Sequence, residues 1–342
     1  MKRQIAIFLL LIFFISPLAG FAQMRSPQNP RLGFIIHGGA GVISRKDLTP
    51  QKEAEFRKKL EEAVLAGYKV LQSGKTSLDA VETAIRIMED SPLFNAGKGA
   101  VFTADGKNEL DASIMEGKGL NAGSVAGLHR VKNPISLARK VMENSPHVMM
   151  IGDGAEKFAR EQKIELVPAQ YFWTKHRWDA LQKIIKEEKA KNKKVSEFRN
   201  PSSQNERYGT VGAVALDKNG DLAAGTSTGG MTYKKYGRVG DAPIIGAGTY
   251  ANNQTCGVSA TGWGEYFIRL SIARDISAIV EYKGVSIQEA VDTVIKQKLQ
   301  NLGGDGGVVA LDKNGNIGIS FNSEGMYRAY IDENGKPIVQ IY

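Results

Sequence analysis

The sequence predicts a mixed α/β fold in which sheets pack against each other and helices cover their outer faces. Short apolar runs typical of buried strands occur in both halves of the 342-residue chain, and amphipathic stretches with helical spacing lie between them. In addition, VALDKNGD (214–221) recurs as VALDKNGN (309–316), an apolar run followed by an Asn-Gly turn. Two copies are too few for a solenoid, so we expect two hairpins of one sheet.

The first half of the chain begins with an expected strand at 32–41 that runs into a glycine turn. It contains His37, which we expect to be structural because no other catalytic side chain lies beside it. Helices at 50–73 and 77–88 follow, the first starting at Pro50 and the second at a capping box of Thr76 and Asp79. A turn-rich loop at 90–99, a strand at 110–115, a strand or turn region near 124–127, and helices at 134–143 and 154–162 complete this half.

The periodic pattern ends near residue 183, and a linker is expected over about 183–209. Residues 183–199 contain seven Lys or Arg and three Glu, without aromatic residues interleaved in a nucleic-acid-binding motif. A solvated linker is therefore favoured over a nucleic-acid surface, although the chain has a net charge of +9. Beyond it we expect a strand from residue 211, a helix at 264–280 with Ile268, Ile272 and Ile279 on one side, and a helix at 286–302.

The N-terminus has the three parts of a signal peptide. Lys2 and Arg3 precede an uncharged run at 5–15, and small residues lead to an expected cleavage after Ala22. The run is too short for a membrane-spanning helix. We therefore expect residues 1–22 to be removed and residues 23–342 to form a single periplasmic or secreted domain without membrane attachment. Its one cysteine, Cys256, excludes an internal disulfide.

Two short patterns point to other enzyme classes and are set aside. GTSTG (225–229) matches the serine elbow of α/β-hydrolases, but that fold needs a histidine after the serine, and all four histidines lie upstream. GAGTYA (246–251) has glycine spacing typical of dinucleotide-binding sites, yet NNQ follows where a helix should begin. Zinc-binding spacings such as CxxC and HExxH are absent from the sequence.

Thr210 is the central candidate residue, because Gly209 and Thr210 stand between the polar linker and an apolar strand. A self-cleaving N-terminal nucleophile needs this arrangement. The glycine leaves the preceding carbonyl open to attack, the strand fixes the threonine, and the linker lets the new end move away. The alternative is that Gly-Thr simply starts a strand, since threonine is common there.

Six segments in one order resemble the plant-type (type III) L-asparaginase and isoaspartyl peptidase family of N-terminal nucleophile hydrolases. They span nearly all of the mature chain: IHGGAG (36–41), FNAG (94–97), GTVGAVA (209–215), TSTGG (226–230), GRVGD (237–241) and ATGWGE (260–265). The resemblance implies a four-layer αββα sandwich. It also implies self-cleavage between Gly209 and Thr210, which gives an α-subunit of residues 23–209 and a β-subunit of residues 210–342, and a dimer of αβ units.

The resemblance also implies roles for individual residues. Thr210 would be the nucleophile, Thr228 would orient it, and Thr261 and Gly262 would form the oxyanion hole. Arg238 and Asp241 would bind the α-carboxylate and α-ammonium of the substrate, although a surface ion pair between these two residues is the alternative. The surrounding substrate-binding residues would be Val239, Gly240, Thr261, Gly262, Trp263 and Gly264.

An N-terminal threonine has its own base, because its α-amine has a reference pKa of about 7.7 to 8.0. No cofactor is therefore expected for catalysis. The family resemblance implies a structural sodium ion bound by backbone carbonyls of Met88, Glu89, Ser91, Phe94, Ala96 and Lys98.

The implied reactions are hydrolysis of L-asparagine to aspartate and ammonia and hydrolysis of β-aspartyl dipeptides to amino acids. Glycosylasparaginase activity ranks second, because Gly209 stands where those enzymes usually have an aspartate. An exported amino-acid-binding module is the alternative of another class, since it would need Arg238 and Asp241 but no Gly-Thr junction.

Overall fold

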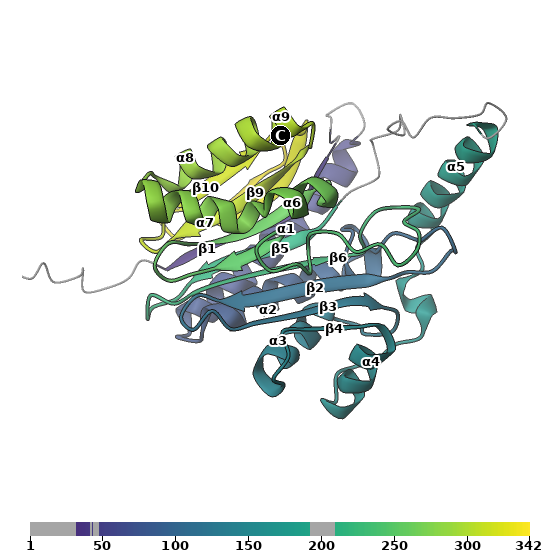
Figure 1. Cartoon of the computed structure of the whole chain (residues 1–342), viewed down its shortest axis with the longest axis horizontal. Helices are drawn as coiled ribbons and strands as arrows, with labels where there is room; N and C mark the ends of the chain where they lie inside the picture. The colour runs from purple at the N-terminus through teal and green to yellow at the C-terminus, as the bar shows by residue number, and fades with distance from the viewer. Residues whose placement is uncertain (1–31, 42, 44–47, 192–208) are drawn as a thin grey trace, which may run out of the picture.

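The computed structural model describes residues 32–41, 43, 48–191 and 209–342. The expected signal peptide and residues 192–208 of the expected linker lie outside these ranges. Figure 1 shows two sheets with helices on their outer sides. The predicted mixed α/β class is confirmed.

The larger sheet joins strands from both sides of Thr210. Within the described residues it contains eight strands, in the order β12 (Pro337–Gln340), β11 (Gly325–Ile331), β1 (Gly33–Gly41), β5 (Val211–Leu216), β6 (Leu222–Thr228), β2 (Leu110–Glu116), β3 (Ala122–Leu128) and β4 (Met149–Ile151). Strand β1 pairs antiparallel with β11 on one side and β5 on the other. Groups of strands from before and after Thr210 therefore alternate across the sheet: β12 and β11 come from after it, β1 from before, β5 and β6 from after, and β2, β3 and β4 from before.

The smaller sheet comes entirely from the part of the chain after Thr210. Its order over the described residues is β10 (Ile317–Phe321), β9 (Gly306–Asp312), β8 (Cys256–Gly262) and β7 (Thr249–Ala251). The two similar hairpins are β5–β6 in the larger sheet and β9–β10 in the smaller one, so the expectation that they share a sheet is wrong. Strands β5 and β9 resemble each other because both are buried on two faces, between a sheet and a helical layer.

Helices cover the outer face of each sheet. Those nearest the larger sheet are α1 (Pro50–Gln72), α2 (Ser77–Glu89), α3 (Pro134–Asn144) and α4 (Gly152–Glu161). Those over the smaller sheet are α6 (Gly264–Leu270), α7 (Ile272–Lys283), α8 (Ile287–Asp292), a π-helical segment (Thr293–Leu299) and α9 (Gln300–Leu302). Helix α5 (Lys175–Lys191) projects from the body in Figure 1.

The side chains of the strands alternate between the apolar layers. In β5, Val214 and Leu216 belong to a cluster between the sheets that includes Val309 and Leu311 of β9. The intervening Ala215 belongs to the cluster under α1, α2 and α3. This two-residue period fixes which face of β5 each side chain occupies, starting from Thr210.

Three elements differ from the sequence prediction. The expected glycine turn after residue 37 is instead the continuation of β1, with a register shift between His37 and Gly39. The single helix expected at 264–280 breaks at Ser271, which has a left-handed φ of 49°. Ile268 is consequently 36% exposed, whereas Ile272 and Ile279 are buried. Helix α5 continues to Lys191, so the first part of the expected linker is helical.

Three turns share one construction. Asp217, Asp312 and Asp332 each lie at the end of a strand and begin an Asp-x-Asn-Gly sequence. In each turn one carboxylate oxygen accepts hydrogen bonds from the backbone N–H groups two and four residues later, at 2.8 to 3.2 Å. Only the first two of these turns belong to the repeated segment of the sequence, because the strand before the third has a different sequence.

Candidate active site

Thr210 lies directly before β5, where that strand runs between β1 and β6. Its side chain is buried, with the residue 6% exposed. Its Oγ1 atom is 2.7 Å from the carbonyl oxygen of Gly209 and 3.1 Å from Oγ1 of Thr228. The hairpin β5–β6 brings Thr228 to this position, since Val211 and Ser227 are cross-strand neighbours. The structure thus brings the two predicted hydroxyl groups together.

The carbonyl group of Gly209 is surrounded by donors. Oγ1 of Thr228 donates to its oxygen at 2.9 Å, and Nδ2 of Asn95 donates to it at 2.9 Å. The same nitrogen of Asn95 donates to the Gly230 carbonyl at 2.7 Å, and Oδ1 accepts from the Val101 amide at 2.9 Å. These contacts fix the orientation of the Asn95 amide.

Asn95 is the main functional candidate that the sequence analysis missed. It lies within the FNAG segment, for which the resemblance implies no catalytic side chain. The only signal in the sequence was a polar residue beside Phe94 in a loop rich in turn formers. Its partner Gly209 is 114 residues away along the chain.

Gly39 provides the space around the Gly209–Thr210 peptide bond. Its φ of 114° is unfavourable for other residues, and a Cβ atom there would lie 3.1 Å from Cα of Gly209 and 3.3 Å from N of Thr210. The register shift of β1 occurs at this position. The glycine-rich segment 38–41 therefore forms one wall of the site.

His37 is buried near this wall but remains neutral. Its Nε2 atom is 2.9 Å from Oγ of Ser259, which also contacts Oγ1 of Thr226 at 2.7 Å. Burial lowers the pKa of His37 to about 3, although the backbone of Thr210 acts in the opposite direction. The side chain joins β1 to the smaller sheet, which agrees with the structural role expected from the sequence.

Thr261 and Gly262 lie at the end of β8, next to the segment 38–41. Oγ1 of Thr261 accepts a hydrogen bond from the Ala40 amide at 3.2 Å. Gly262 has a φ of 157°, and a Cβ atom there would lie 2.7 Å from Cα of Gly306. Thr261 is thus linked to the nucleophile region by β1, because Ala40 contacts Thr261 and the neighbouring Gly39 packs against Gly209 and Thr210.

Arg238 pairs with Glu265, a residue to which the sequence analysis gave no role. Its Nε donates to Oε1 of Glu265 at 2.9 Å and its Nη2 donates to Oε2 at 2.7 Å. Although burial acts in the opposite direction, this guanidinium holds the pKa of Glu265 below its usual value. The alternative surface ion pair with Asp241 is not the pairing seen. Within the part of the chain that the structure describes, both hydrogens on Nη1 and one on Nη2 remain for another acceptor.

Asp241 lies close to this pair and is itself 5% exposed. Its Oδ2 atom is buried without a hydrogen-bond partner within the described residues. Burial raises the pKa of Asp241 to about 7, although the charge of Arg238 acts in the opposite direction. A buried carboxylate oxygen without a donor is costly, so this atom is suited to a cationic ligand group.

The other predicted substrate-binding residues lie around Arg238. A Cβ atom on Gly240 would be 2.8 Å from Nη1 of Arg238, and one on Gly264 would be 2.8 Å from Nη2 and 2.9 Å from Oδ1 of Asp241. Val239 lies between Arg238 and Gly240 in the chain, and the ring of Trp263 packs edge-on against Tyr266.

Gly230 connects the two groups of residues. Its N–H donates to Oγ1 of Thr228 at 3.0 Å, and a Cβ atom on it would lie 3.6 Å from Nη1 of Arg238. The nucleophile candidate and the candidate clamp therefore belong to one continuous site.

The two patterns set aside from the sequence do not form the sites they resemble. Ser227 lies inside strand β6, and its Oγ donates to Oε1 of Glu89 at 2.6 Å. Burial raises the pKa of Glu89 to about 8, although its hydrogen bonds act in the opposite direction. Residues 246–251 lead into strand β7, where a dinucleotide site would require a helix.

The loop predicted to bind sodium follows α2. Met88 and Glu89 end that helix, and the remaining predicted positions are Ser91, Phe94, Ala96 and Lys98. Among the residues that the structure describes, no cluster of three or more His, Cys, Asp or Glu could hold a metal ion. No helix in the same part of the chain is both long enough and apolar enough to cross a membrane.

Comparison with known proteins identifies the family. A family model described as asparaginase matches residues 30–341. The chain is 49% identical to the isoaspartyl peptidase of Escherichia coli (strain K12) over 307 residues, which cover 90% of this chain and 95% of the relative. It is 45% identical to the plant-type L-asparaginase of Pyrococcus furiosus over 308 residues, 89% of this chain and 98% of the relative. The chain therefore belongs to the asparaginase family that contains plant-type L-asparaginases and isoaspartyl peptidases.

Proposed function

We propose that this protein is a threonine amidohydrolase that cuts its own chain before Thr210 and then hydrolyses L-asparagine and β-aspartyl dipeptides. One observation carries the proposal: Oγ1 of Thr210 lies 2.7 Å from the carbonyl oxygen of Gly209, which Thr228 and Asn95 also contact. The names of the relatives, isoaspartyl peptidase and plant-type L-asparaginase, support the substrate class.

Self-cleavage would begin with attack of the Thr210 hydroxyl oxygen on the carbonyl carbon of Gly209. Negative charge would develop on the carbonyl oxygen, where Nδ2 of Asn95 and Oγ1 of Thr228 already donate hydrogen bonds. The C–N bond then breaks, the nitrogen takes up the proton, and Gly209 is left as an ester on Thr210. Water hydrolyses this ester and leaves a carboxylate on Gly209 and a free amine on Thr210.

In turnover, the free amine of Thr210 would act as the base for its own hydroxyl group. The hydroxyl oxygen attacks the side-chain carbonyl of asparagine or the β-aspartyl peptide bond, and ammonia or an amino acid leaves with the proton. The hydroxyl of Thr261 and the amide of Gly262 would stabilise the oxyanion. Water then releases aspartate from the acyl-enzyme.

Arg238 and Asp241 would bind the amino-acid end that both substrates share. Glu265 occupies the Nε side of the guanidinium and leaves the Nη1–Nη2 edge for a carboxylate. The buried Oδ2 of Asp241 is suited to the α-ammonium. Val239, Gly240, Trp263 and Gly264 would line this part of the pocket.

We further propose that the packing of the two sheets and their helices is the four-layer αββα sandwich of N-terminal nucleophile hydrolases. The separate apolar clusters on the two sides of each sheet support this. We also propose export after removal of residues 1–22 and a dimer of αβ units. Sequencing of the mature N-terminus and light scattering would test these two points, and a retained Met1 or a single αβ unit would contradict them.

The loop after α2 fits a sodium ion bound by backbone oxygens, which hard cations prefer. A Cβ atom on Gly97 would collide with the carbonyl oxygen of Glu89, and one on Gly99 with that of Phe94, so the loop closes on its own carbonyl groups. The ion would stabilise this loop, which contains Asn95. Thermal unfolding at a higher temperature in sodium chloride than in choline chloride is expected, and equal temperatures would contradict the site.

The central experiment compares wild-type protein with Thr210→Ala on a denaturing gel and in an ammonia-release assay. The wild type should give two bands and hydrolyse asparagine and β-aspartyl dipeptides, whereas Thr210→Ala should remain one inactive chain. A Thr210→Ala protein that splits at this junction would show that another residue is the nucleophile. Wild-type activity on glycosylasparagine alone would favour a glycosylasparaginase, and binding without turnover would favour an amino-acid-binding module.

A further inference from the structure

The loop between β6 and β7 has an unfavourable backbone. Tyr233 and Tyr236 have φ angles of 67° and 59°, a region that residues with side chains rarely adopt. The side chain of Tyr236 is fully exposed, so its packing cannot hold the chain there. Because Arg238 and Asp241 follow in the same loop, other contacts must keep this part of the site in place.

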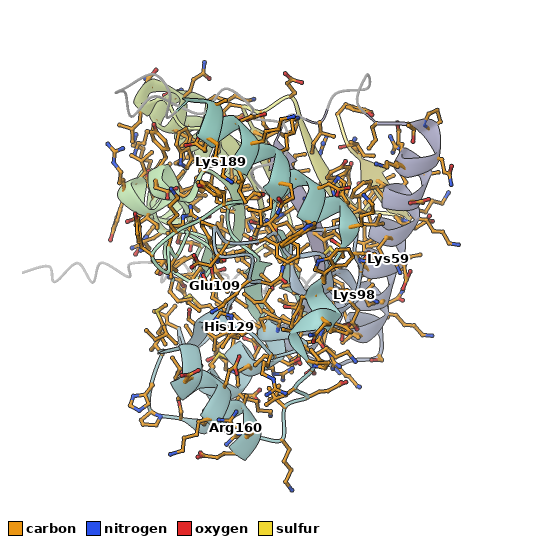
Figure 2. The ribbon with its side chains drawn as sticks, turned by 90° about the vertical axis from the view of Figure 1, so that its right-hand side faces the viewer. Lys59, Lys98, Glu109, His129, Arg160 and Lys189 are labelled. Carbon is orange, nitrogen blue, oxygen red and sulfur yellow. The ribbon has the colours of Figure 1, made fainter. Side chains whose placement is uncertain are left out.

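Lys234 supplies those contacts. Its side chain is only 1% exposed, and its Nζ donates to the Glu109 carbonyl at 3.1 Å. Two carboxylates also face the ammonium group: Oε2 of Glu109 at 3.6 Å and Oδ2 of Asp111 at 3.8 Å. In Figure 2, Glu109 lies just above His129 on the face that α5 crosses. An ammonium group this deeply buried is costly unless it is paired, and these two carboxylates are its charged partners.

The Lys234–Asp111 pair lies between the nucleophile region and the clamp. Asp111 is the cross-strand neighbour of Thr228 and is fully buried. A Cβ atom on Gly230 would lie 3.1 Å from Nζ of Lys234 and 3.6 Å from Nη1 of Arg238, so both cations border this residue. Without Lys234, Arg238 would be the remaining cation that interacts with the buried carboxyl group of Asp111, and Asp111 would compete with the substrate carboxylate for the guanidinium.

We propose that Lys234 is a positioning residue for substrate recognition, which neutralises Asp111 and fixes the loop so that Arg238 keeps its Nη1–Nη2 edge for the substrate carboxylate. The inference rests on the proposed function of Arg238. Lys234 itself does not touch the substrate.

The test is steady-state hydrolysis of a β-aspartyl dipeptide by mature Lys234→Met protein, with self-cleavage followed on a gel. KM should rise by at least about tenfold, while self-cleavage goes to completion. The double variant Lys234→Met/Asp111→Asn should return KM to within about threefold of the wild type, because the carboxylate that competes for Arg238 is gone. Lys235→Met is the matched control, since Lys235 is the exposed neighbour in the same loop and should leave KM unchanged.

Two results would overturn the inference. One is a Lys234→Met protein whose KM stays within twofold of the wild type, even if its melting temperature falls. The other is a double variant whose KM remains tenfold high, which also decides the matter if Lys234→Met alone fails to fold. If neither the wild type nor Lys235→Met hydrolyses the dipeptide, the proposed function itself is contradicted.

Discussion

The two parts of the candidate site are built differently. Around Thr210 the groups in contact are neutral: the hydroxyl of Thr228 and the side-chain amide of Asn95. Thr210 and Thr228 lie at the ends of the paired strands β5 and β6 of the larger sheet. Around Arg238 the groups are charged, and they lie on a loop and at the start of α6. Strands thus hold the two threonines of the proposed chemistry, and charged side chains hold the residues of the proposed recognition site. Self-cleavage and substrate affinity should therefore respond to different substitutions.

The largest effect is expected for Asn95→Ala, on the nucleophile side. Removal of the Nδ2 donor to the Gly209 carbonyl should slow self-cleavage by about a hundredfold to a thousandfold, as loss of one oxyanion donor typically does. The measurement is a time course of chain cleavage on a denaturing gel.

Asn108→Ala is the matched control for that variant. Nδ2 of Asn108 donates to the carbonyl groups of Ala100 and Val101 near the same loop, without reaching Gly209. It should cleave at close to the wild-type rate. Equal slowing in both variants would mean that Asn95 only supports the loop.

Arg238→Ala should affect the other side of the comparison. Loss of the charge-assisted bond to the substrate carboxylate, about 1.5 to 3 kcal/mol, corresponds to a fall in kcat/KM of about 10- to 150-fold for β-aspartyl dipeptides. The gel should show complete self-cleavage. Arg238→Lys keeps the charge but loses the planar guanidinium group, so its kcat/KM should lie between those of Arg238→Ala and the wild type. An unchanged kcat/KM in Arg238→Ala would place the clamp elsewhere.

The pH dependence of binding should report Asp241. Burial raises the pKa of Asp241 to about 7, so the carboxylate becomes neutral as the pH falls below that value and can no longer pair with an ammonium group. The Kd for L-aspartate should increase by up to about tenfold per pH unit below 7. A Kd that is constant between pH 5.5 and 8 would exclude Asp241 as the ammonium ligand. We choose to measure the Kd and not the catalytic rate, because the α-amine of Thr210 in the cleaved protein is also expected to titrate in this pH range and would change the rate.

The smallest effect on activity is expected for His37→Gln. His37 belongs to neither the nucleophile region nor the Arg238 region, so activity at pH 7 should be unchanged. Burial lowers the folded-state pKa to about 3, so the unfolded chain binds a proton first as the pH falls below 6.5. The stability linked to His37 is therefore present above pH 6.5 and is lost towards pH 3, by at most about 1.4 kcal/mol per pH unit. Unfolding of Thr210→Ala protein with and without His37→Gln measures this, and identical slopes would contradict it.

The sequence could predict the parts of the site that depend on local pattern. Thr210 and Thr228 meet because a tight hairpin joins their strands, and an Asn-Gly turn signals such a hairpin. The capping box of Thr76 and Asp79 is also confirmed, since it depends on four consecutive residues. The roles expected for Arg238, Asp241, Thr261 and Gly262 came from the family resemblance and not from local pattern.

Contacts between distant residues could not be predicted in this way. Asn95 reaches Gly209 across 114 positions, and Arg238 reaches Glu265 across 27. The assignment of the two similar hairpins to different sheets depends on which layers cover them, and both hairpins have the same pattern. The helix break at Ser271 has no glycine or proline to announce it.

The alternation of strands across the larger sheet has a consequence for refolding. A cut before Thr210 would leave every strand in place, yet the ladders β11–β1, β1–β5 and β6–β2 would then each join two separate molecules. The intact precursor can find its fold as one chain, whereas the mature pieces, once unfolded, must first meet in solution. The refolding rate after removal of denaturant should thus be independent of protein concentration for Thr210→Ala and second-order in protein concentration for the mature protein. In dilute solution the unfolded precursor would still refold, whereas the two mature chains would rarely meet.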